Sequence, residues 1–342
     1  MRRPLLLPSL CLALIGSSLT GCGLFGGSSH LEDALEVVPA SVSSVRFFDR
    51  AAAMERLDVK ELDADASDEE IDEYVEASQT FPSYTALDQY LLPMLEHAPF
   101  SAQDVDWEVD GSDADNGFGR VWKMDDDLDL DDVIDELEDS GYDAEDVDDG
   151  TRLSIELGEI DDDEQYLVAL QTVTILPGDH LMVTGPLADD FLEAIADDAD
   201  SAVDKDTFED LVDSTDDAEF AALARDDLPC RSMNATPEQA DAFDSLGRPE
   251  QTGFFVHGDD GDARSVLLFG DDDAADDDAK ARGEYLAEGV NAMSGEPFDE
   301  YADWEVEADG ERVHVDLEFD EPRILLAVIQ SGDYTSFSAC GS

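Results

Sequence analysis

The chain has 342 residues, of which 89 are Asp or Glu and 18 are Lys or Arg, so its formal net charge is −71. Hydrophobic residues make up 42% of the sequence, which is enough to build a core and too much for a disordered acidic chain. So negative a surface repels nucleic-acid phosphates, which excludes DNA and RNA partners, and it also repels anionic lipid headgroups. The acids are spread along both halves, which favours adaptation of the whole surface to a salty medium.

The N-terminus has the pattern of an export signal. A positive start, residues 1–3, precedes an apolar stretch over residues 5–15 that is too short for an ordinary membrane-spanning helix. The following residues resemble the bacterial lipobox, in which the Cys is acylated and the chain is cleaved on its amino side: Leu19, Thr20, Gly21 and Cys22. We therefore expect a lipoprotein signal peptide over 1–21, and a lipidated Cys22 followed by a flexible tether over 22–31. The alternative is a plain secretory peptide with an incidental Cys.

The remaining cysteines suggest one disulfide. The chain has four cysteines, of which Cys11 lies in the apolar stretch and Cys22 is the predicted lipid carrier. Cys230 and Cys340 remain, and in an oxidising compartment we expect them to form a disulfide. A zinc site is a poor alternative because no His lies within a few residues of either Cys.

The first half alternates short apolar strands with amphipathic helices. Its predicted helices include one opened by the capping box Ser67 to Glu70 and one capped by Asp129. Predicted strands cover 44–48, 104–110, 117–124, 151–157, 173–176 and 181–184, and predicted helices cover 67–79, 84–96, 129–141 and 187–195.

The second half repeats this order of elements. Predicted strands cover 220–225, 253–257, 265–269, 303–307, 312–319 and 334–340, with a helix as the alternative for 220–225. Predicted helices start at Thr236 and cover 274–293 and 324–329.

An internal repeat accompanies this order. Asp106-Trp107-Glu108-Val109 recurs as Asp303-Trp304-Glu305-Val306, and Tyr-Leu and Pro-Phe pairs precede both copies. The alternative is a chance similarity in an acidic sequence, where Asp and Glu match easily. The succession indicates an α+β fold of two ferredoxin-like (βαββαβ-type) repeats with a mainly antiparallel sheet. We expect the first repeat, with an added hairpin and helix, over 32–200 and the second over 201–342. The two repeats could form one continuous sheet or two sheets face to face.

The sequence contains few residues in patterns that carry chemistry. Its five histidines show no ligand spacing, and neither a nucleophile elbow nor a phosphate-binding loop is present. We expect no cofactor. The alternative is a Ca²⁺ ion held by the acidic turn that contains Asp259, Asp260 and Asp262, whereas a solvated charged turn is the simpler interpretation.

These features together resemble uncharacterised bacterial lipoproteins of the actinobacterial type. The resemblance rests on the lipobox, the excess of Arg over Lys and the acidity, and it implies no activity. We expect a non-catalytic binding or scaffolding module, anchored through Cys22 to the outer face of the cell membrane. Its partner would be an envelope protein or a small molecule, held in a groove between the two repeats that is lined by aromatics such as Trp107, Trp122 and Trp304. The simpler interpretation of these three residues is that they belong to the core. The alternatives are a carboxylate-based or metal-assisted envelope hydrolase and a calcium-dependent surface element.

Overall fold

The computed structural model describes residues 29–62, 66–113, 117–156, 168–203, 208–212, 215, 218–226, 228–231, 243, 245–258, 262–290 and 297–341. Within them, helices and an antiparallel sheet form the predicted α+β fold. The predicted signal peptide, Cys22 and most of the predicted tether lie outside these residues.

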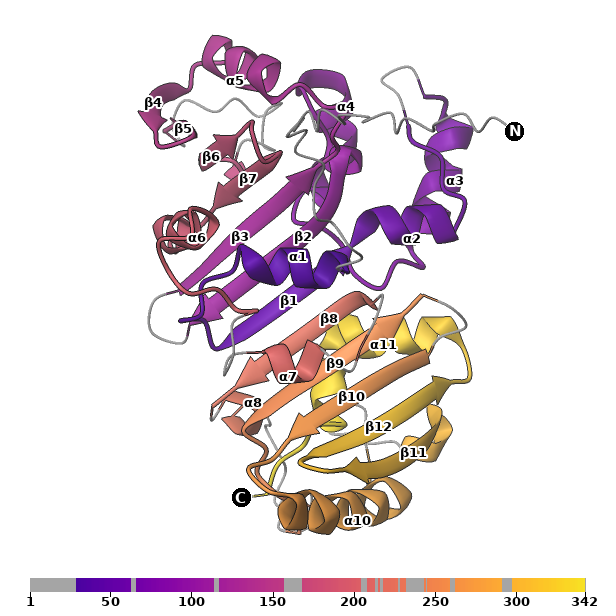
Figure 1. Cartoon of the computed structure of the whole chain (residues 1–342). Helices are drawn as coiled ribbons and strands as arrows, with labels where there is room; N and C mark the ends of the chain where they lie inside the picture. The colour runs from indigo at the N-terminus through magenta and orange to yellow at the C-terminus, as the bar shows by residue number, and fades with distance from the viewer. Residues whose placement is uncertain are drawn as a thin grey trace, which may run out of the picture.

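The described strands form one 12-stranded sheet, in which every neighbouring pair is antiparallel. It runs through both halves of the molecule (Figure 1), so the chain forms one continuous sheet. In spatial order the strands are β11 (Ala302–Asp309), β12 (Arg312–Phe319), β10 (Asp262–Leu268), β9 (Gln251–His257), β8 (Ala218–Arg225), β1 (Ser44–Asp49), β2 (Val105–Asp113), β3 (Gly117–Met124), β7 (Leu181–Thr184), β6 (Thr172–Leu176), β5 (Gly150–Ser154) and β4 (Asp143–Val147).

The two halves meet where β1 pairs with β8. The pairing runs from Ser44 opposite Ala224 to Phe48 opposite Phe220. Beside it, the Arg225 guanidinium donates hydrogen bonds to two carbonyls of the chain that leads into β1, Val42 O at 2.9 Å and Ala40 O at 2.5 Å.

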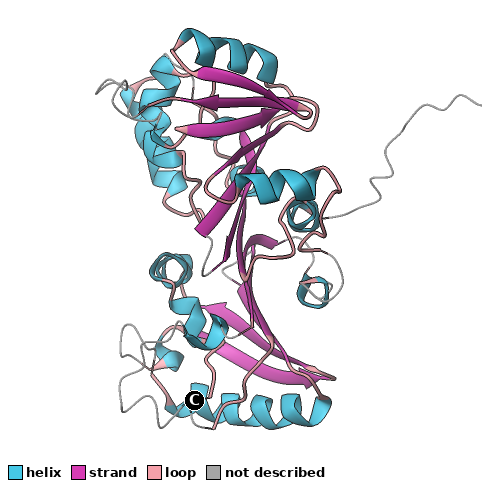
Figure 2. Cartoon of the chain, turned by 90° about the vertical axis from the view of Figure 1, so that its left-hand side faces the viewer, coloured by secondary structure: helices cyan, strands magenta, loops and turns pink. Residues whose placement is uncertain are grey.

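Helices cover both faces of the sheet, as Figure 2 shows from the side. One face carries α1 (His30–Glu36), α6 (Ala188–Ile195) and α7 (Glu209–Val212) over its middle. The opposite face carries helices toward its two ends, with α3 (Asp68–Ser78), α4 (Leu91–His97) and α5 (Leu130–Asp139) on the first half and α10 (Asp272–Glu288) and α11 (Pro322–Ser331) on the second. The remaining described helices are α2 (Arg50–Arg56), α8 (Leu228–Arg231) and the 3-10 turns η1 (Asp88–Tyr90), η2 (Ala102–Asp104), η5 (Phe298–Glu300) and η6 (Asp333–Ser336).

Alternation along the central strands divides the core between the two faces. On β1, Phe47 packs with α1 and α6, whereas Phe48 points to the other face. On β8, Leu223 joins the same core as Phe47, and Phe220 joins the core beneath α10 and α11. One hydrophobic core therefore spans the junction between the halves, and two others lie toward the ends of the opposite face. Phe48 belongs to a smaller cluster with Ala53 and Phe81.

The topology does not confirm two ferredoxin-like repeats. In a split βαβ unit the two strands that a helix joins run parallel, with another strand between them. Here the helical segment after β1 leads to β2, which pairs with β1 directly and antiparallel. The matching Trp strands also occupy different positions, because β2 lies inside the sheet between β1 and β3, whereas β11 is its outermost strand. Trp107 is accordingly buried, and Trp304 is only half-buried.

Most predicted elements are confirmed, and several differ. The predicted strand over 334–340 is wrong, because residues 333–336 form a 3-10 turn. The helix expected over 84–96 is shorter, since the Asp88 carboxylate accepts a hydrogen bond from the Thr85 backbone and regular α-helix begins at Leu91. Helices α1 and α2 and the acidic strand β4 were not predicted, and the helix expected from Thr236 lies outside the described residues.

The C-terminal segment is fastened by a buried ion pair and a disulfide. Arg282 and Asp278, one turn apart on α10, have fully buried side chains, with Nε 2.9 Å from Oδ2. Arg282 also donates to the carbonyls of Phe337 and Ala339, each at 2.9 Å. Just beyond them, Cys340 forms the predicted disulfide with Cys230, which follows β8.

We predict that removing this disulfide with the double substitution Cys230→Ser and Cys340→Ser lowers the free energy of unfolding by about 2–5 kcal/mol, because the link closes a 110-residue separation and restricts the unfolded chain. Urea denaturation with and without a thiol reductant measures the effect. The reductant should shift the wild-type midpoint to that of the variant and leave the variant unchanged. A wild-type midpoint insensitive to the reductant would contradict the prediction.

Candidate binding grooves

An apolar groove of about 530 Å³ lies between α3, η1 and α4. Three large apolar side chains on its walls are unusually exposed, Val75 by 44%, Tyr84 by 39% and Leu92 by 46%. The remaining lining residues are Leu62, Ile71, Tyr74, Ser78, Thr85, Asp88, Gln89, Leu91 and Pro93. Clustered apolar exposure is typical of interaction surfaces, which makes this groove a candidate binding site.

Helix α3 presents one apolar stripe to this groove. The predicted capping box is present, because Ser67 accepts from Glu70 N–H and the Glu70 carboxylate accepts from Ser67 N–H. Ile71, Tyr74 and Val75 recur at helical spacing and face the groove. The other side of the helix is almost entirely acidic.

A buried arginine forms the support beneath the groove. The Arg50 side chain is fully buried; its Nη2 donates to the Tyr74 hydroxyl, and its Nε lies 3.6 Å from Asp88 Oδ1. Burial raises the pKa of Tyr74 to about 12, and it raises the pKa of Asp88 although Arg50 opposes that shift. The guanidinium also lies 5.8 Å from the centre of the Phe81 ring. Arg50 thereby fixes α3 and η1, which form two walls of the groove.

A second buried carboxylate lies on β2. Glu108 Oε2 accepts hydrogen bonds from Ala86 N–H at 2.8 Å and Trp122 Nε1–H at 2.5 Å. Burial, and then the charge of Asp110, raise the pKa of Glu108 to about 7, although Arg120 lies 3.6 Å away and opposes the shift. The contacts of Glu108 are internal, so this carboxylate holds the segment before η1 against the sheet.

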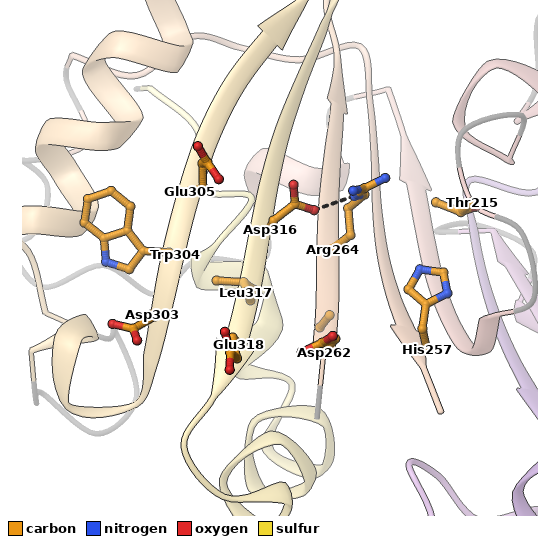
Figure 3. A pocket seen from close by; sticks show the side chains of 11 residues that line it. Thr215, His257, Asp262, Arg264, Asp303, Trp304, Glu305, Asp316, Leu317 and Glu318 are labelled. Atoms are coloured by element: carbon orange, nitrogen blue, oxygen red, sulfur yellow. Dashed lines mark hydrogen bonds and ion pairs between the residues drawn. The ribbon is translucent and has the colours of Figure 1, made fainter. Parts of the chain in front are cut away.

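A polar hollow of about 750 Å³ lies on the second half of the sheet, over β10, β11 and β12 (Figure 3). On β12 alternate residues point into the core beneath α10 and α11, which leaves His314, Asp316 and Glu318 on the hollow's side. Arg264 Nε on β10 donates to Asp316 Oδ1 on the neighbouring strand β12 at 2.5 Å (dashed in Figure 3). Burial lowers the pKa of His314, and the positive charge of Arg264 adds to this.

The hollow is acidic but shows no arranged cation site. Asp262, one of the predicted calcium ligands, lines it, whereas Asp259 and Asp260 lie outside the described residues. Among the residues that the structure describes, no group of three or more His, Cys, Asp or Glu side chains is placed to hold a metal ion.

The aromatic groove predicted from the sequence is not present as expected. Trp107 and Trp122 are buried in two different cores on opposite faces of the sheet, and Trp304 lines the polar hollow. The apolar groove of α3 and α4 was not predicted, because its support joins Arg50, Tyr74 and Asp88, which are far apart in the sequence. The one local signal was the apolar stripe on α3.

The sequence matches no family model and no curated protein. Among solved structures, three crystal forms of TP0453 are similar over 86–87% of this chain and 95–97% of their own chains, with 10–12% sequence identity and TM-scores of 0.41–0.43. Scores this low carry no argument about function.

We predict that Glu108→Gln changes how stability depends on pH. The folded-state pKa of Glu108 is raised above its unfolded value, so protonated Glu108 stabilises the fold at acid pH and this contribution is lost as the pH rises from about 4.5 to about 7. Gln keeps the acceptor for Ala86 and Trp122 without a charge. The variant should therefore gain stability relative to wild type between pH 5 and pH 8, on the order of 2 kcal/mol.

Urea denaturation at several pH values measures this difference. The matched control is Glu305→Gln, which removes an exposed carboxylate from β11 and should follow the wild-type pH profile. A Glu108→Gln profile parallel to that of wild type would refute the assignment.

Proposed function

We propose that the chain is an exported lipoprotein, anchored through Cys22 to the outer face of the cell membrane, whose folded domain binds a partner without catalysing a reaction. The observation that carries the binding role is the apolar groove, in which Val75, Tyr84 and Leu92 stay exposed. The anchor rests on the sequence of residues 19–22.

The disulfide supports export. A disulfide between Cys230 and Cys340 forms and persists in an oxidising compartment, which is where an exported domain folds. In the described part of the chain, no helix has both the length and the apolar character needed to cross a membrane.

The groove favours binding over the hydrolase alternative. Glu108, which has a strongly raised pKa, is engaged by Ala86, Trp122 and Arg120 and does not line the groove. Asp88 does line it, but it is held by Arg50 and by the Thr85 backbone. The contacts of both carboxylates thus give each of them a structural role, and a catalytic role is not needed to explain their burial.

We predict that Cys22→Ser releases the protein from the membrane, because the substitution removes the thiol that carries the lipid. Wild type should incorporate radiolabelled palmitate and sediment with membranes, whereas the variant should do neither. Cys11→Ser, in the apolar stretch of the signal peptide, is the matched control and should behave as wild type. Label retained by Cys22→Ser, or absent from wild type, would contradict the anchor.

A further inference from the structure

We infer that the groove between α3, η1 and α4 receives a basic amphipathic helix of a partner protein. This inference rests on the proposed binding role and names its partner class. Three observations carry it: the shape of the groove, the charge around it and its position beside the junction of the two halves.

The groove is open along its walls. Val75 on α3 and Leu92 on α4 each keep nearly half of their surface exposed, and Tyr84 keeps 39%. In a pocket that encloses a small ligand, the lining side chains are mostly buried by the protein itself. Here they are open to solvent, and a helix that packs across the groove would bury them. The volume of about 530 Å³ accommodates a few apolar side chains, the number that one face of a short helix presents.

The surroundings of the groove are strongly anionic. Residues 60–100 contain eleven Asp or Glu and one Lys or Arg, Lys60, which lies near Glu70. On α3, helical spacing places Asp68 and Asp72 on one flank of the apolar stripe and Glu70 on the other. The one guanidinium in contact with lining residues, among those described, is Arg50, which is fully buried and paired with Asp88. An apolar slot with acidic flanks complements an apolar stripe with basic flanks.

The same charge argues against other occupants. A second copy of the chain would bring a further net charge of −71 and the same acidic flanks. An anionic lipid surface would be repelled by Asp68, Asp72 and their neighbours. A basic helix is attracted over a distance and then held by apolar contact, which gives both rapid association and specificity.

The groove also lies beside the junction between the halves. The Tyr84 hydroxyl on its wall interacts with the Gln330 side chain of α11, which belongs to the second half. A helix seated in the groove would therefore lie close to both halves of the sheet.

The test uses a synthetic helical peptide of about 18 residues, with Leu at positions i, i+3, i+4 and i+7 and Lys elsewhere. A scrambled peptide of the same composition has the same charge but no apolar stripe. The full chain, reconstituted in phosphatidylcholine vesicles, is titrated with each fluorescent peptide at several salt concentrations. The amphipathic peptide should bind at least roughly tenfold more tightly than the scrambled one, and this ratio should persist as salt weakens both.

Two variants distinguish binding at the groove from non-specific attraction of the peptides to the acidic chain. Val75→Ser combined with Leu92→Ser should abolish the difference between the peptides. Phe118→Ser removes an apolar side chain that is 46% exposed on β3, outside the groove, and should preserve it. Circular dichroism of each variant checks that the fold is retained.

Equal affinity for both peptides, or an unchanged ratio in the double variant, would overturn the inference. Binding to phosphatidylglycerol vesicles that the double variant loses would overturn it in favour of a lipid surface. Flotation of the chain with phosphatidylcholine vesicles reports the anchor separately. If the chain floats with the vesicles but binds both peptides equally, this inference is wrong and the proposed anchor stands. If it prefers the amphipathic peptide but does not float, only the proposed anchor is wrong.

Discussion

The pairing of β1 with β8 is the interaction on which the rest of the fold depends, because it turns two sets of strands into one sheet. Backbone hydrogen bonds from Ser44 to Phe48 form the junction. At one end of the pairing, Arg225 of β8 hydrogen-bonds to the chain before β1. At the other end, Arg56 Nε pairs with Glu219 Oε1 at 2.5 Å. The core beneath α1 and α6 continues across the junction, so burying it requires both halves.

Several of the scarce basic residues fix this architecture. Arg50 and Arg282 are fully buried, one in each half, and each holds segments that are distant in the sequence. Arg225, Arg56 and Arg264 join neighbouring strands or segments. These arginines are engaged in pairs within the protein, the sequence has 89 acidic residues against 18 basic ones, and the apolar groove stands out against this acidity.

The sequence predicted elements whose signal is local, and it failed where tertiary contacts decide. The capping box at Ser67 and the Asp129 cap marked α3 and α5, and alternation marked most strands. Strand β4 was missed because it is acidic and exposed, with few apolar residues to show a period. The segment from Asp333 forms a 3-10 turn instead of a strand, and carbonyls farther along it accept hydrogen bonds from Arg282. Likewise, the groove depends on Arg50 meeting Tyr74 and Asp88, which no sequence spacing reveals.

Scanning calorimetry of the full chain at moderate salt tests most directly whether the β1–β8 junction makes the two halves one cooperative unit. The continuous sheet and shared core predict a single unfolding transition, with a calorimetric enthalpy equal to the van't Hoff enthalpy. Two resolved transitions, each with the enthalpy of about half the chain, would contradict this account of the fold.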